Sequence, residues 1–232
     1  MRNEMKFIGL LVLTWVLVAS NSANATLVNI TTGNLDDFRY EIGGGTIEVV
    51  DTTSAPGTAS DLSLELVWPT TNDDAGIQIT DLGDPTVSDI DSWDYWVKAA
   101  LTKNPHLTMF LDTDGDDSWD TFVRDKRYNA GFDDAWLKLD SSETMSFKIK
   151  KTGFASENWS GTWAEFQTAY GTATVKEIKI CREGFSVGYP ATAYLDDFTF
   201  GDTTYQIVPE PATIALLGLG SLVLLRRRRK SI

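Results

Sequence analysis

Cysteine and histidine are nearly absent from this sequence, and their scarcity excludes several kinds of site. Cys181 is the single cysteine among 232 residues, so the chain forms no intrachain disulfide and no thiolate zinc site. His106 is the single histidine, which excludes metal sites with several imidazoles. A Ser-His-Asp triad would have to use His106.

Recognised catalytic motifs are missing as well. The sequence contains no phosphate-binding loop, no G-x-S-x-G and no dinucleotide fingerprint. Glycoside hydrolysis needs two carboxyl groups in distinct environments at a defined separation, and no such pair stands out among the many acidic residues. We therefore expect a protein that is not an enzyme.

Positive charge is also in short supply. Lys and Arg number 20 against 33 Asp and Glu, giving a formal net charge of −13. The first 25 residues carry +1 and the residues from 209 onward carry +4, so the part between them carries −18. Such a surface repels nucleic acid, and it repels anionic polysaccharide unless divalent cations intervene. Neutral glycans, cations and basic surfaces stay possible partners.

The N-terminus has the three parts of a secretory signal peptide. Arg2 and Lys6 precede an apolar run over residues 7–19, and Ala23-Asn24-Ala25 supplies a cleavage site. We expect signal peptidase to remove residues 1–25. The alternative is an uncleaved N-terminal anchor.

The C-terminus, residues 208–232, has the order of a stop-transfer segment. Pro209, Glu210 and Pro211 precede the 14 uncharged residues 212–225, fewer than the roughly 20 that a helix needs to span a bilayer comfortably. A basic cluster follows, which stays on the cytoplasmic side of a membrane: Arg226, Arg227, Arg228, Arg229 and Lys230.

This order resembles the PEP-CTERM sorting tail of bacterial exported proteins. The resemblance implies recognition by an exosortase-type membrane enzyme, transient anchoring by the apolar helix, and removal of the tail. It also implies delivery to the cell surface, the outer envelope or the extracellular polysaccharide matrix. The alternative is an ordinary single-span anchor.

Residues 26–207 are expected to form one domain rich in β-strands. Apolar and polar residues alternate with period two in short runs separated by Gly, Pro and Asp, which indicates half-buried antiparallel strands. The runs predict an all-β, jelly-roll-like sandwich. They cover residues 46–51, 62–68, 76–80, 93–98, 106–111, 120–124, 136–139, 145–150, 175–181, 193–200 and 204–208.

One short helix interrupts the strands. Thr162 and Glu165 form a capping box, and Gly171 provides a stop. Trp163, Phe166 and Tyr170 recur at the spacing of one helical face. We expect this helix to close one end of the sandwich.

A second resemblance covers about a quarter of the chain. The runs at 161–166, 175–178, 193–198 and 201–205 are similar to the closing part of jelly-roll domains related to carbohydrate-binding modules. The resemblance implies that the last strand pairs with the first, beside a structural calcium. Asp37 and Asp197 would then be candidate calcium ligands.

The densest acidic cluster lies in residues 112–120. Asp112, Asp114, Asp116 and Asp120 occupy positions 1, 3, 5 and 9 of an EF-hand-like pattern and predict a Ca²⁺ site. The glycine is at position 4 rather than 6, and position 12 is Val123 rather than an acid. The alternative is a hairpin turn whose aspartates are solvated.

Tryptophans supply the candidate sugar platforms, because the C–H face of a pyranose packs on an aromatic ring. Trp119, beside the acidic cluster, and Trp159, in a polar segment, are the expected exposed ones. The others are assigned to the core: Trp68, Trp93, Trp136 and Trp163.

Three functions remain open. The first is a non-catalytic module that binds carbohydrate or matrix at the cell surface. The second is a structural envelope or matrix protein of the same fold without a ligand. The third is a polysaccharide-active enzyme, which a cleft with two facing carboxylates, or with a Tyr, an Arg and His106 together, would support.

Overall fold

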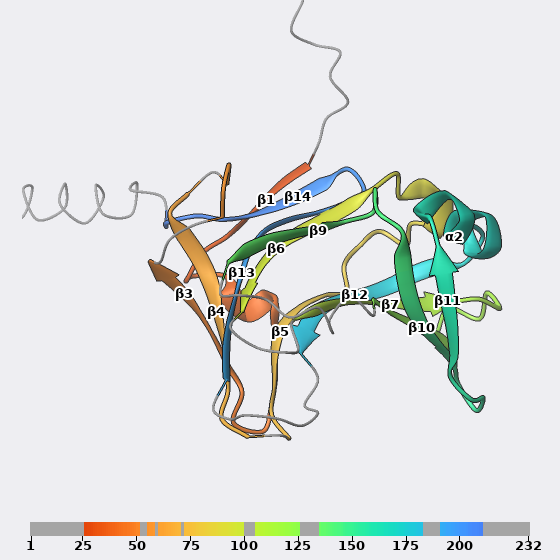
Figure 1. The fold of residues 1–232 in the computed structure, drawn as a ribbon, viewed down its shortest axis with the longest axis horizontal. Helices are drawn as coiled ribbons and strands as arrows, with labels where there is room; N and C mark the ends of the chain where they lie inside the picture. The colour runs from red at the N-terminus through yellow and green to blue at the C-terminus, as the bar shows by residue number, and fades with distance from the viewer. Residues whose placement is uncertain are drawn as a thin grey trace, which may run out of the picture.

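A computed structural model describes residues 26–51, 55–58, 60–70, 72–99, 105–125, 135–182 and 191–210. These residues form two large β-sheets and one short α-helix, so the all-β expectation is confirmed (Figure 1). The expected leader and the apolar and basic parts of the tail lie outside the described residues. Within the described part, no helix is both long enough and apolar enough to span a membrane.

The first sheet has the order β1-β14-β13-β4-β3, with β6 pairing to β13 and β9 pairing to β6. Its strands are β1 (Thr26–Ile30), β3 (Thr46–Asp51), β4 (Leu62–Trp68), β6 (Trp93–Ala99), β9 (Trp136–Asp140), β13 (Ala191–Phe200) and β14 (Thr203–Ile207). The first and last strands pair, as the jelly-roll resemblance implied, but they pair in parallel, which departs from the antiparallel pairing that the sequence predicted.

The second sheet has the order β11-β10-β8-β7-β12-β5-β2 and is antiparallel throughout. Its strands are β2 (Arg39–Ile42), β5 (Asp74–Ile79), β7 (His106–Asp112), β8 (Thr121–Asp125), β10 (Met145–Lys151), β11 (Glu157–Gly161) and β12 (Thr174–Arg182). In Figure 1, β12 and β7 lie in the middle of this sheet, between β5 and the pair β10 and β11.

The core lies between the two sheets and contains side chains that recur at every second position along the strands. Each of these side chains is at most 2% exposed: Leu64, Trp93, Tyr95, Met109, Phe147, Ile178 and Ile180. Cys181 in β12 is fully buried. Trp136 is a correction, because it is half-buried at the start of β9, the strand next to β6, and lies outside the buried cluster.

Helix α2 (Trp163–Tyr170) begins and ends as predicted. The Thr162 hydroxyl accepts a hydrogen bond from the Glu165 amide at 3.3 Å, and the Glu165 carboxylate accepts one from the Thr162 amide at 2.8 Å. The Trp163 indole donates to the carbonyl of Ile90 at 2.7 Å. This bond fixes the helix against the short 3-10 helix η2 (Val87–Asp89) at one end of the sandwich.

Candidate functional site

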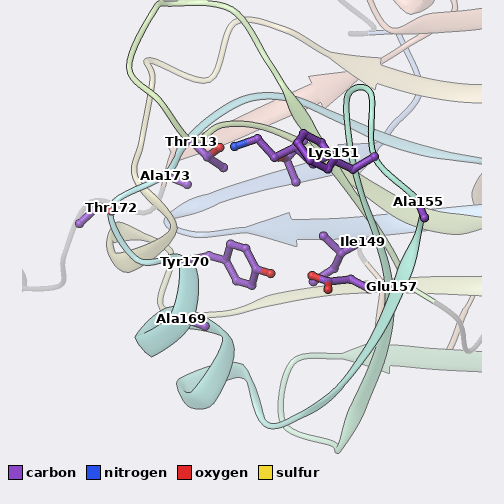
Figure 2. A pocket seen from close by; sticks show the side chains of 11 residues that line it. Thr113, Ile149, Lys151, Ala155, Glu157, Ala169, Tyr170, Thr172 and Ala173 are labelled. Carbon is purple, nitrogen blue, oxygen red and sulfur yellow. The ribbon is translucent and has the colours of Figure 1, made fainter.

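A pocket of about 600 Å³ lies between helix α2, the β10–β11 hairpin and the ends of the β7–β8 loop (Figure 2). Three segments that are distant in the sequence meet here, because β10 pairs with both β8 and β11 while α2 follows β11 directly. The lining residues are Thr113, Thr121, Ile149, Lys151, Phe154, Ala155, Glu157, Ala169, Tyr170, Thr172 and Ala173.

Tyr170 and Glu157 form the polar centre of this pocket. The two side chains point toward one another in Figure 2, and Glu157 takes part in a hydrogen bond with the Tyr170 hydroxyl. Burial raises the pKa of Tyr170, and the negative charge of Glu157 and this hydrogen bond raise it further. The hydroxyl is therefore neutral at physiological pH, with its proton held toward Glu157.

Aromatic surface and a cation complete the lining. The ring of Tyr170 stacks on Phe166 at 4.8 Å between centroids, which fixes its orientation. Phe154 is 67% exposed at the rim. Figure 2 shows the Lys151 amino group reaching toward Thr113. Among the described residues, Glu157 is the only carboxylate in the lining, so this pocket does not present two facing carboxylates.

The acidic loop, residues 112–120, borders the pocket through Thr113. It brings together three of the four predicted calcium ligands, since the carboxylate oxygens of Asp112, Asp114 and Asp116 lie within 4.8 Å of one another. Asp112 is 5% exposed, and its two oxygens accept hydrogen bonds from the amides of Gly115 at 2.7 Å and Asp117 at 3.0 Å. Gly115 has a φ of +78°, which favours glycine at this position.

Asp120, the fourth predicted ligand, lies outside this group of three. Its carboxylate accepts hydrogen bonds from the hydroxyls of Thr113 at 2.8 Å and Thr121 at 2.6 Å. Burial acts to raise the pKa of Asp120, but the hydrogen bonds from Thr121 and Thr113 outweigh it and lower that pKa. A hydrogen bond from the Ser118 hydroxyl lowers the pKa of Asp116. Both carboxylates are thus ionised above acidic pH.

One lysine offsets part of this negative charge. Lys176 pairs with Asp117 in the loop and with Asp84 at 3.0 Å. Its hydrogen bonds to Asp117 and Asp84 raise the pKa of Lys176 to about 12. A solvated turn with a partial internal counter-charge therefore accounts for this arrangement of carboxylates as well as a cation site does.

Asp37 and Asp197, the other predicted metal ligands, lie in separate elements. Asp37 is exposed in the 3-10 helix η1 (Leu35–Asp37), and Asp197 in β13 accepts a hydrogen bond from the Ile207 amide at 3.0 Å. Phe38 packs against Tyr205 of β14 at 6.2 Å, so this early segment does lie beside the last strand. In the described part of the chain, no group of three acidic, histidine or cysteine side chains includes Asp37 or Asp197.

The two predicted sugar platforms lie outside the pocket lining. Trp119 is 46% exposed and meets the ring of Phe110 edge-on at 5.0 Å. Trp159 is half-buried, with its ring stacked on Phe147 at 5.6 Å. Tyr170 and Phe154, which do line the pocket, were not singled out from the sequence as binding residues. The only signal for Phe154 was its position in a polar turn after Gly153.

The predicted sorting motif begins where the domain ends. Val208 follows β14 directly, and the Val208 amide donates to the carbonyl of Ile30 at 3.0 Å. The Glu210 carboxylate accepts a hydrogen bond from the Thr32 hydroxyl at 2.8 Å. Pro211 and the basic cluster lie outside the described residues.

Comparison with protein families identifies the C-terminal segment. Residues 208–230 match the family described as PEP-CTERM protein-sorting motif. The chain therefore carries, after an all-β domain, the motif of an exported cell-surface protein. No curated protein matches the chain.

Solved structures similar to this chain include three carbohydrate-related proteins. The CBM22-1 xylan-binding domain from Paenibacillus barcinonensis Xyn10C is 14% identical over 71% of this chain and 85% of its own, with a TM-score of 0.38. The arabinose-bound MgGH51 α-L-arabinofuranosidase is 12% identical over 70% of this chain and 23% of its own, with a TM-score of 0.37. SGBP-B from a complex xyloglucan utilization locus in Bacteroides uniformis is 14% identical over 73% of this chain and 47% of its own, with a TM-score of 0.32.

Proposed function

We propose that the domain of residues 26–207 is a non-catalytic carbohydrate-binding module of the cell surface or extracellular matrix, and that its ligand occupies the pocket beside helix α2. The observation that carries this proposal is the combination of Tyr170, Phe154, Glu157 and Lys151 in one pocket.

The chemistry of the lining suits a sugar. A pyranose presents an apolar C–H face that packs on an aromatic ring, and Tyr170 and Phe154 supply such rings. Its hydroxyls both donate and accept hydrogen bonds, which Glu157, Lys151 and the threonines can complement. The volume falls within the range of roughly 300–1,000 Å³ that is common for small-molecule sites.

A binding role fits this pocket better than a hydrolytic one. Glycosidase chemistry uses two carboxyl groups that flank the scissile bond, whereas the described lining has only Glu157. The raised pKa of Tyr170 also disfavours the phenolate that a tyrosine base would need.

The processing that we propose follows from the sorting motif at 208–230. Signal peptidase removes residues 1–25, and an exosortase-type enzyme removes the tail after the apolar segment has held the chain in the membrane. The mature protein then belongs to the cell surface, outer envelope or extracellular matrix. The polysaccharide there is its proposed partner.

Calcium is proposed as a structural ion at the acidic loop, with Asp112, Asp114 and Asp116 as ligands and Asp120 beside them. The gathering of three carboxylates within 4.8 Å supports this assignment. A bound cation would offset their mutual repulsion and hold the loop that borders the pocket. The junction near Asp37 and Asp197 is the alternative site.

The test is glycan-array binding followed by titration of the best glycan, with and without chelator. Phe154→Ala should weaken binding on the order of tenfold, because stacking on one aromatic ring contributes about 1–1.5 kcal/mol. Leu137→Ala on the other sheet is the control, since Leu137 is also exposed, at 39%. If no glycan binds, the structural matrix protein becomes the better interpretation. If Phe154→Ala binds like the wild type, the ligand lies elsewhere.

A further inference from the structure

The outer face of the second sheet carries a basic patch on an otherwise acidic protein. The patch consists of Arg124 on β8 and Lys148 and Lys150 on β10, arranged around Phe122. Their sequence neighbours Val123, Phe147 and Ile149 are buried in the core, so the patch side chains lie on the opposite face.

The strand register extends this patch into two continuous rows. One row runs across the sheet through Asn158, Lys148, Arg124, Thr108, Lys179 and Gln78. The adjacent row runs through Lys150, Phe122, Phe110 and Glu177. Glu177 is the only carboxylate in these two rows, and its Oε1 lies 2.9 Å from Lys179 Nζ.

The exposed half of this face combines cations with aromatic surface. The Arg124 guanidinium lies 5.5 Å and the Lys150 ammonium 6.0 Å from the centroid of the Phe122 ring. Among the described residues, no carboxylate pairs with Lys148 or Lys150. Lys150 is exposed, while Lys148, Arg124 and Phe122 are half-exposed. Trp119 extends the aromatic surface through its contact with Phe110.

We propose that this basic patch binds a carboxylate-bearing polysaccharide, such as a chain of uronic acids, at a site separate from the pocket beside α2. The carboxylates of the polymer would pair with Arg124, Lys148 and Lys150. Its C–H faces would pack on Phe122. Neighbouring strands lie about 4.8 Å apart, a spacing similar to the rise of one sugar in an extended chain, so successive sugars can meet successive strands.

The overall charge of −18 does not prevent this binding. At physiological salt, fixed charges are screened within about 8 Å, so a polymer lying on the patch responds chiefly to the residues it touches. The overall charge instead disfavours a bulkier polyanion such as nucleic acid, whose other phosphates would lie over the acidic surroundings.

The experiment uses the full chain in a nonionic detergent, with alginate as the polyuronate, dextran as the neutral polymer and chelator throughout to prevent calcium bridging. The double variant Lys148→Gln/Lys150→Gln should bind alginate on the order of tenfold more weakly, since each partly exposed ion pair contributes up to about 1 kcal/mol. Raising the salt from about 50 to 200 mM should weaken wild-type binding.

The matched control is Lys98→Gln/Lys138→Gln, which removes the same charge from β6 and β9 on the other sheet. It should bind alginate like the wild type, as should Lys148→Arg/Lys150→Arg. The tail arginines are common to all variants and do not affect these differences. Equal losses in both Gln variants, or equal binding of dextran, would overturn the proposal. Equal affinity for single-stranded DNA would also overturn the proposal, because it would show that charge attraction alone accounts for the binding. Phe154→Ala should not alter alginate binding, which separates this site from the pocket.

Discussion

A buried carboxylate is predicted to destabilise this domain increasingly as the pH rises from about 4 to about 6. Asp196 in β13 is fully buried, and its oxygens accept hydrogen bonds from the amides of Ala55 at 2.9 Å and Asp197 at 2.8 Å. Burial is the largest influence on this group and outweighs those hydrogen bonds, so the pKa of Asp196 is raised from 3.8 to about 6.

The direction of the effect follows from the two pKa values. Below pH 3.8 the carboxyl is protonated in both the folded and the unfolded chain, so its titration costs no stability. Between 3.8 and about 6 the unfolded chain releases the proton first, and the folded state loses stability. Above about pH 6 the Asp196 carboxyl is ionised in both the folded and the unfolded chain, and the folded state bears the full free-energy cost of the buried charge. At about 1.4 kcal/mol per pH unit, this cost is on the order of 3 kcal/mol.

The assay compares the wild type with Asp196→Asn by chemical denaturation at several pH values between about 3.5 and 8, a range that covers both pKa values. The stability of the wild type relative to the variant should fall by about 3 kcal/mol across this range, or about 6–12 °C in Tm for a domain of this size. The side-chain amide of Asn has one acceptor oxygen fewer than the carboxylate at every pH. The informative quantity is therefore how the stability difference between wild type and variant changes with pH, not its absolute value. Asp51→Asn, at an exposed position in β3, should show no such change. A wild-type-to-variant difference that stays constant from pH 4 to 8 would refute the reasoning.

Three further predictions concern the ion, the helix and the tail. Millimolar calcium should raise the Tm of the wild type by mass action but not that of Asp114→Ala, and an unchanged wild-type Tm would identify the acidic loop as a solvated turn. Thr162→Ala should lower the free energy of unfolding by about 1 kcal/mol because it removes the helix cap, whereas Thr168→Ala, at an exposed position in the same helix, should cost less; equal costs would contradict the capping role. Intact-mass measurement of surface material should find neither residues 1–25 nor residues 226–230, and retention of the latter would indicate an ordinary anchor.

The sequence predicted most of the sheets because the strands alternate regularly. Every run with a clear period of two, such as residues 93–98 and 145–150, corresponds to a strand. The strands β1, β2 and β11 were not predicted. Of the five residues of β11, none is fully buried and four are polar or glycine, so no alternation marks that strand in the sequence. It is a strand because it pairs along β10 at the edge of the sheet.

The candidate site was harder to predict than the fold. The acidic loop is local in sequence, and three of its four predicted ligands do come together. The pocket depends on Thr113, Glu157 and Tyr170, which belong to separate segments that tertiary packing brings together. At the sequence level Tyr170 was indistinguishable from the core face of its helix, with Trp163 and Phe166. The basic patch was hidden for the same reason, because Arg124 and the two lysines become neighbours only through the register of β8 and β10.

The parallel pairing of β1 with β14 has a mechanical consequence. Thr26 lies opposite Thr203, and Ile30 lies opposite Ile207, so the chain enters at one end of this strand pair and leaves at the other. A pull between the two ends of the domain therefore acts along the strands, and their backbone hydrogen bonds bear the load together in shear. A force applied in this way does not peel the two strands apart, which would break their hydrogen bonds one at a time. Before the proposed removal of the tail, a pull on it is therefore transmitted along β14, the strand to which the tail is joined.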